Sequence, residues 1–76
     1  MKIIDEIKFR KTTYLLLDRK EMNGSFKVVK HGVNNKLKTV FQDVNLVSAR
    51  SFFNKLCDLG HQGLNIDGFI KNHGME

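Results

Sequence analysis

The segment 45–60, NLVSARSFFNKLCDLG, limits the fold more than any other part of the chain, because its apolar residues have a helical period. Ala49, Phe52, Phe53 and Leu56 recur at the spacing of one face of an α-helix. Burial of a Phe or Leu side chain stabilises a protein by roughly 1.5–3 kcal/mol before entropy is counted. We therefore predict an amphipathic helix whose apolar face forms the core.

Local signals also mark the ends of the helical segments. Asn45 is a suitable N-cap, and Gly60 can adopt the left-handed conformation that ends a helix. Asn65 can cap a short C-terminal helix that Gly74 closes. Gly68 weakens that helix by about 1 kcal/mol relative to Ala, so a short C-terminal strand is the alternative.

Three segments before the helix predict β-strands: 7–18, 26–33 and 36–44. The pair Asn23 and Gly24 predicts a hairpin turn between the first two strands, and Asn34 with Asn35 predicts a second turn. Short connections favour antiparallel neighbours. The expected fold is α+β, with a three-stranded antiparallel meander packed against one amphipathic helix and a short C-terminal helix or strand. Residues 1–76 form a single compact domain.

The composition indicates a soluble globular protein. Apolar residues make up 41% of the 76 residues, and charged residues make up 28%. The first stretch, MKIIDEIKFRK, contains no apolar core of a signal peptide, and no apolar run reaches the ~18 residues of a membrane span. The single cysteine excludes an internal disulfide. We expect a cytoplasmic protein that does not insert into membranes.

The sequence contains no motif of a catalytic nucleophile, a phosphate-binding loop or a zinc protease. Cys57 belongs to the apolar face of the predicted helix, where a buried thiol is unreactive. Cys57 and the histidines at positions 31, 61 and 73 lack the close spacing of zinc ligands. We therefore expect a protein that is not an enzyme and that needs neither a cofactor nor a metal ion.

The net charge of +5 favours an acidic partner, although a merely solvated basic surface is the alternative. If the helix covers the face that carries Phe9, Leu15, Leu17, Leu37 and Phe41, alternation places a basic set on the opposite face. The candidate binding residues there are Lys8, Arg10, Tyr14, Lys27, His31, Lys36 and Lys38.

The stretch SFKVVKHGVNNKLKTVFQDVNLVSARSFFNKLCDLG resembles the AP2-like arm-binding domains of integrases, which place a three-stranded sheet before one helix. Those domains use the sheet in the DNA major groove. The resemblance implies phosphate contacts for Lys27, Lys36 and Lys38, and positions near bases for His31 and Tyr14.

The whole chain resembles the small anti-CRISPR proteins of phages and mobile elements. The resemblance rests on size, on the MNGS hairpin, on the single helix SARSFFNKL, on the compact tail and on the missing enzymatic motifs. It implies an inhibitor that occludes a surface of a CRISPR effector or similar nucleoprotein complex. The alternative is a small basic DNA- or RNA-binding module that uses its exposed sheet face. Either protein is expected to be a monomer or a homodimer.

Overall fold

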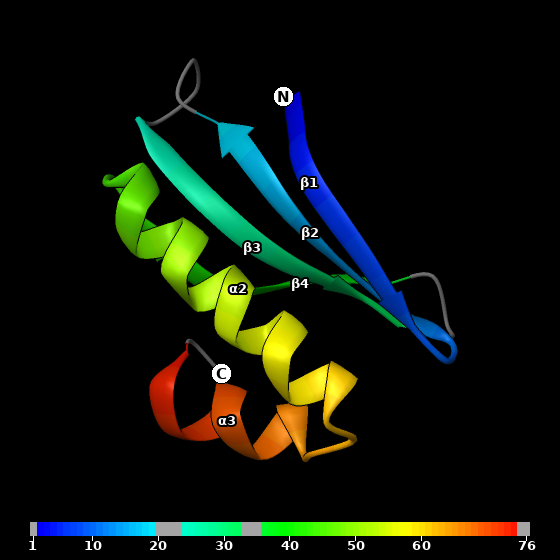
Figure 1. The fold of residues 1–76 in the computed structure, drawn as a ribbon. Coiled ribbons are helices and arrows are strands. Elements are labelled where there is room, and N and C mark those ends of the chain that lie inside the picture. The colour runs from blue at the N-terminus through cyan, green and yellow to red at the C-terminus, as the bar shows by residue number, and fades with distance from the viewer. Residues whose placement is uncertain (1, 20–23, 33–35, 75–76) are drawn as a thin grey trace.

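A four-stranded antiparallel sheet with two helices packed against it forms the fold (Figure 1). The computed structural model describes residues 2–19, 24–32 and 36–74. The strands are β1 (Lys2–Phe9), β2 (Thr12–Arg19), β3 (Ser25–His31) and β4 (Leu37–Asp43), and they neighbour one another in chain order. The helices are α2 (Leu46–His61) and α3 (Ile66–His73). The predicted α+β class and antiparallel meander are confirmed, but the sheet has four strands rather than three.

The predicted strand 7–18 is wrong, because the chain forms two strands there, β1 and β2, with a turn between them. The chain reverses at Arg10 and Lys11, so that Phe9 pairs with Thr12 across a two-residue turn. Arg10 has φ 57°, the left-handed region that non-glycine residues rarely enter. This turn contains none of the Asn, Gly or Pro residues by which such turns are recognised in sequences. The packing of both strands against the helices stabilises it instead.

The two-residue turn also decides which side chains of β2 face the helices. Residues directly opposite on neighbouring strands share a face, and Ile7 lies opposite Tyr14. Tyr14 and Leu16 therefore join Ile7 and Phe9 on the helix side, and Tyr14 is only 4% exposed. Leu15 and Leu17 turn to the other side, which we call the outer face. The predicted positions of Leu15, Leu17 and Tyr14 are thus wrong by one residue of register.

A bulge in β4 has the same consequence for the last strand. Val28 lies opposite Phe41, but Val29 lies opposite Thr39, so Val40 is an extra residue. Val40 is 1% exposed and belongs to the core. The bulge reverses the alternation and places Leu37, opposite His31, on the outer face. The predicted helix-facing position of Leu37 is therefore wrong.

The ends of α2 follow the capping rules, with one correction. The Asn45 side chain accepts a hydrogen bond from the Val47 amide at 2.8 Å, which confirms Asn45 as the N-cap. Gly60 lies within the helix, and its neighbour in space is the ring of Phe9. The glycine with left-handed φ, 71°, is Gly63. The Leu64 amide donates to the Leu59 carbonyl at 2.9 Å, as in a Schellman motif.

The C-terminal element is the predicted helix and not the alternative strand. The Asn65 side chain accepts from the Gly68 amide at 3.1 Å, and Gly74 is the C-cap. Gly74 packs so closely against β4 that a Cβ atom would meet the Val40 carbonyl oxygen at 2.3 Å. The predicted turn at Asn34 and Asn35 lies outside the described residues, as does Asn23. Gly24 has the left-handed φ of 72° that a turn residue needs.

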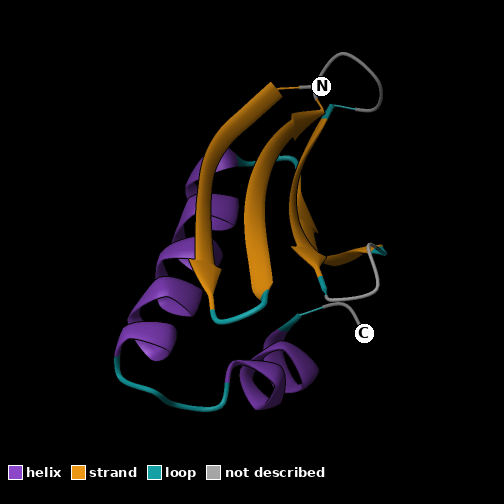
Figure 2. Ribbon diagram, turned by 90° about the vertical axis from the view of Figure 1, so that its right-hand side faces the viewer, coloured by secondary structure: helices purple, strands orange, loops and turns teal. Residues whose placement is uncertain are grey.

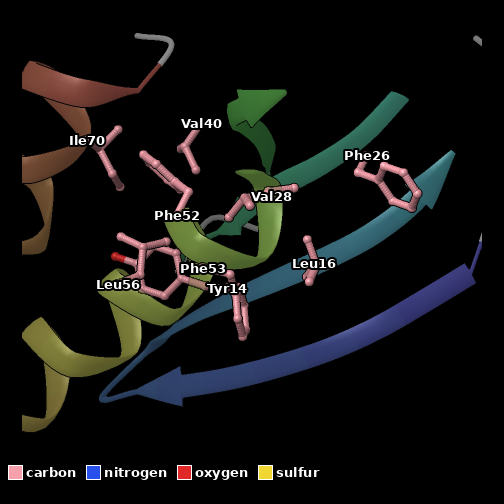
Figure 3. Packing of buried hydrophobic residues seen from close by; sticks show 10 residues of the cluster. Tyr14, Leu16, Phe26, Val28, Val40, Phe52, Phe53, Leu56 and Ile70 are labelled. Carbon is pink, nitrogen blue, oxygen red and sulfur yellow. The ribbon is translucent and has the colours of Figure 1, made fainter. Parts of the chain in front are cut away.

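One hydrophobic core lies between the sheet and the two helices (Figure 3). All four residues of the predicted helix stripe are buried in it: Ala49, Phe52, Phe53 and Leu56. The Phe52 ring stacks on Phe41 with centroids 4.4 Å apart and meets Phe69 of α3 at 5.0 Å. Phe52 therefore connects α2 with both β4 and α3.

Replacement of Phe52 by Ala should lower the free energy of unfolding by about 3–5 kcal/mol, because it leaves a cavity at the junction of three elements. Chemical denaturation monitored by circular dichroism measures this change. Lys55→Ala is the control, since Lys55 is exposed on the same helix and its loss should change stability by less than about 0.5 kcal/mol. Similar losses in both variants would contradict the described core.

The turn at Arg10 generates a second prediction about stability. Glycine tolerates positive φ without strain, so Arg10→Gly should leave stability unchanged or raise it by up to about 1 kcal/mol. Arg10→Val should lower stability by about 1–2 kcal/mol, because a β-branched residue is strained there. The same denaturation experiment compares the two variants. Equal destabilisation by Gly and Val would argue against the two-residue turn.

Candidate functional site

Antiparallel topology gathers basic residues at one end of the sheet. The β1–β2 turn, the end of β3 and the start of β4 all lie at this end (Figure 1). We name it the basic end, and it comprises Lys8, Arg10, Lys11, Lys30, His31, Lys36 and Lys38. Neighbouring strands are about 4.8 Å apart, so this group extends about 15 Å across the sheet.

The carboxylates of the described strand residues lie outside the basic end, in the middle of the strands or at the opposite end of the sheet. Asp18 and Asp43 flank Phe26 near the opposite end, and Asp5 accepts from the Arg50 side chain at 2.8 Å. At the basic end, Lys30 lies opposite Lys38, a pair that is repulsive by itself. Asp67 of α3 accepts from Lys30 at 2.9 Å and offsets part of this repulsion. The sheet is therefore electrostatically polarised along its strands.

The structure brings five of the seven predicted site residues together at the basic end: Lys8, Arg10, His31, Lys36 and Lys38. Lys27 lies on the outer face further along β3, opposite Leu17 and Gln42. Tyr14 is buried and is not part of an exposed face. Sequence reasoning missed Lys11, because the predicted strand 7–18 ran through it. A turn assigned to residues 9–12, FRKT, would have placed Lys11 at the end of the sheet. It also missed Lys30. Alternation along the predicted strand puts Lys30 on the same face as Phe26 and Val28, which the helix was expected to cover.

The outer face differs from the predicted basic face. Its middle is apolar, with Leu15, Leu17 and Val29 adjacent to one another, and Leu17 and Val29 are each 5% exposed. Both helices lie on the opposite side of the sheet (Figure 2). Lys8, Lys27 and His31 surround this apolar middle. The outer face thus has an apolar centre, and its periphery carries both polar residues and the exposed side chains of Ile3 and Leu37.

A pocket of about 270 Å³ opens beside the basic end, between the β1–β2 turn and the link from α2 to α3. The sheet contributes Phe9, Arg10, Thr12 and Tyr14 to its lining. Its other lining residues come from the end of α2 and from the first turn of α3: Gly60, Gly63, Leu64, Asn65, Ile66 and Asp67. The pocket therefore depends on the close approach of Phe9 to Gly60, where a Cβ atom would meet the ring at 2.3 Å.

Tyr14 is the buried polar residue of this pocket. Its hydroxyl forms no hydrogen bond with the described residues, although the side chain is only 4% exposed. Figure 3 shows its oxygen at the side of the core where α2 leads toward α3. Burial raises the pKa of Tyr14 to about 12, and the negative charge of Asp67 contributes to the same shift. The hydroxyl is therefore neutral and protonated at physiological pH.

Cys57 is half-buried on α2 and is a free thiol. Burial raises the pKa of Cys57, and the carboxylates of Asp5 and Asp58 raise it further. The thiol is therefore protonated and weakly nucleophilic at neutral pH.

Within residues 2–19, 24–32 and 36–74, no group of three or more His, Cys, Asp and Glu side chains is placed to hold a metal ion. Neither described helix has the length and apolar character that crossing a membrane requires.

Comparison with known proteins adds no family: no family model, no curated protein and no solved structure matches the chain.

The environment of Tyr14 predicts a pH dependence of stability. The unfolded chain loses the phenolic proton at about pH 10, and the folded protein keeps it to about pH 12. The unfolded state therefore binds fewer protons in this interval, and the free energy of unfolding falls as pH rises from about 10 to about 12. The Tyr14→Phe variant has no phenol to titrate, so its free energy of unfolding should fall less between these pH values. The fall that remains in this variant measures the contribution of other titrating groups.

Tyr14 is the single tyrosine in a chain without tryptophan, so the ultraviolet absorbance of phenolate reports this residue alone. The native protein should titrate near pH 12, and the protein in denaturant near pH 10. A native midpoint near 10 would contradict the buried position of Tyr14.

Proposed function

We propose that this chain is a non-enzymatic binding protein of the anti-CRISPR kind, which attaches through its basic end and occludes a nucleic-acid-bearing surface of a CRISPR effector or similar nucleoprotein complex. The observation that carries the proposal is the concentration of basic residues from three separate chain segments at one end of the sheet. Clustered like charges cost stability, and an anionic partner offsets that cost.

The form of the molecule suits occlusion. Sheet and helices share one hydrophobic core, and Lys8, Arg10, Lys11 and Lys36 are exposed at the basic end. A preorganised cationic surface speeds association with an anionic partner and favours it over neutral ones. An inhibitor of this kind needs no chemical step, because it acts by excluding guide or target nucleic acid from its site.

The second candidate is a small DNA- or RNA-binding module that uses the sheet itself. Lys8, Thr13, His31 and Lys27 on the uncovered outer face favour this alternative. The major groove admits a two-stranded β-ribbon, and such residues can contact phosphates and base edges there. Binding of this module to generic duplex DNA would weaken steeply between low and moderate salt.

Charge reversal tests the basic end. We expect Lys8→Glu with Lys36→Glu to weaken inhibition of a sensitive effector complex by about tenfold or more, because two attractive contacts become repulsive. The readout is the binding of target DNA by purified, guide-loaded effector complexes in the presence of increasing concentrations of the protein. The control is Lys2→Glu with Lys55→Glu, which changes the net charge equally at exposed sites away from the basic end.

Thermal denaturation should show that both double variants remain folded. Inhibition by the basic-end variant at the wild-type level, or binding of the protein without loss of target binding, would contradict the proposal. Retention on duplex DNA alone, without inhibition of any effector complex, would support the second candidate instead.

A further inference from the structure

The pocket beside the basic end contains an unsatisfied polar group. A buried hydroxyl without a hydrogen-bond partner lowers stability, because folding removes its hydrogen bonds to water without replacing them. The Tyr14 hydroxyl is in this situation: its side chain is 4% exposed, it lines the pocket, and it bonds no described residue. Phenylalanine would fill the same space without this cost, so the hydroxyl points to a partner that enters the pocket.

The lining of the pocket offers both hydrogen-bond donors and acceptors. The Tyr14 hydroxyl can donate or accept, and one oxygen of Asp67 accepts from Lys30 at 2.9 Å. The Asn65 side-chain oxygen is occupied by the Gly68 amide at 3.1 Å, which leaves its NH₂ group as a donor. Mixed polarity of this kind does not select a simple anion or cation. It suits a ligand whose edge carries donors and acceptors side by side.

Apolar side chains also line the pocket. Phe9 contributes an aromatic ring, and Leu64 contributes an aliphatic side chain that is 53% exposed at the mouth. A volume of about 270 Å³ lies just below the usual range of small-molecule sites, so the pocket has room for no more than a small ligand such as one ring system. Pockets that hold an extruded base combine these two features, since they stack on its faces and form hydrogen bonds with its edge.

Arg10 connects the pocket with the basic end. It lines the pocket and belongs to the β1–β2 turn, next to the exposed Lys11. A base in the pocket would have its sugar and phosphates at the mouth, within reach of both cations. This arrangement joins a base site with a phosphate site, as in proteins that bind single strands.

We propose that the pocket receives one unstacked nucleobase of a single-stranded nucleic acid, whose neighbouring phosphates lie against Arg10 and Lys11. The proposal deepens the proposed function, on which it rests, and identifies the occluded surface as one that exposes an unpaired strand. Bases in a duplex cannot enter the pocket without unpairing.

Fluorescence anisotropy with labelled oligonucleotides of about ten nucleotides tests this inference at low salt. The probes are single strands of each base and a duplex of equal length. Tyr14→Phe removes only the hydroxyl, and Leu64→Trp narrows the mouth of the pocket. Val47→Trp is the matched control, because Val47 is 72% exposed at the opposite end of α2.

The wild-type protein should bind at least one single strand more tightly than the duplex. Tyr14→Phe should weaken that binding about threefold to tenfold, the effect of one lost hydrogen bond, and leave duplex binding unchanged. Leu64→Trp should weaken it at least as much, and Val47→Trp should not change it. The melting temperature of Tyr14→Phe should equal or exceed that of the wild type, which separates a ligand role from a role in folding.

Equal binding of single strand and duplex, or wild-type binding by both pocket variants, would overturn the base pocket. So would an absence of nucleic-acid binding at low salt. In each of these cases the proposed function is judged separately, by inhibition of the effector complex with the Lys8→Glu and Lys36→Glu variant. Failure of that variant to weaken inhibition overturns the proposed function and leaves the result for the pocket intact.

Discussion

Burial of one face of the sheet is the constraint on which the other features depend. Side chains alternate along a strand, so each strand turns only half of its residues toward α2 and α3. Ile7 and Tyr14 have numbers of opposite parity, so they can share a face only if the turn between β1 and β2 has an even number of residues, and this turn has two. Core packing therefore stabilises Arg10 in the left-handed region, although nothing in the local sequence favours it.

The same constraint distributes the charges. Once β1 and β2 form a hairpin, Arg10 and Lys11 lie at the end of the sheet where β3 ends and β4 begins. Lysines that are far apart in the sequence, such as Lys8 and Lys36, then lie at the same end of the sheet, one on each edge. The basic end is thus a product of topology rather than of any local basic motif.

The pocket connects the packing with the proposed recognition. It exists because Phe9 packs on Gly60, and because the Schellman turn at Gly63 sets α3 beside the β1–β2 turn. Tyr14 belongs to both features. Its ring packs in the hydrophobic core, and its residue also lines the pocket, to which the hydroxyl adds a polar group. In the proposed recognition, the pocket would hold the base, and the cations of the basic end would contact the neighbouring phosphates.

The sequence by itself determined α2, with its N-cap Asn45 and the buried stripe from Ala49 to Leu56, and it offered Asn65 as the cap of a C-terminal helix while a strand remained the alternative. These features depend on contacts within a few residues, and local patterns report them directly. Five of the seven predicted site residues also lie at one end of the sheet, because strand ends could be located approximately. Only the tertiary structure decided the turn at Arg10, the bulge at Val40 and the burial of Tyr14. The reason is physical: alternation is local, but the number of residues in a turn or bulge is selected by packing between distant segments, and one residue reverses every face that follows.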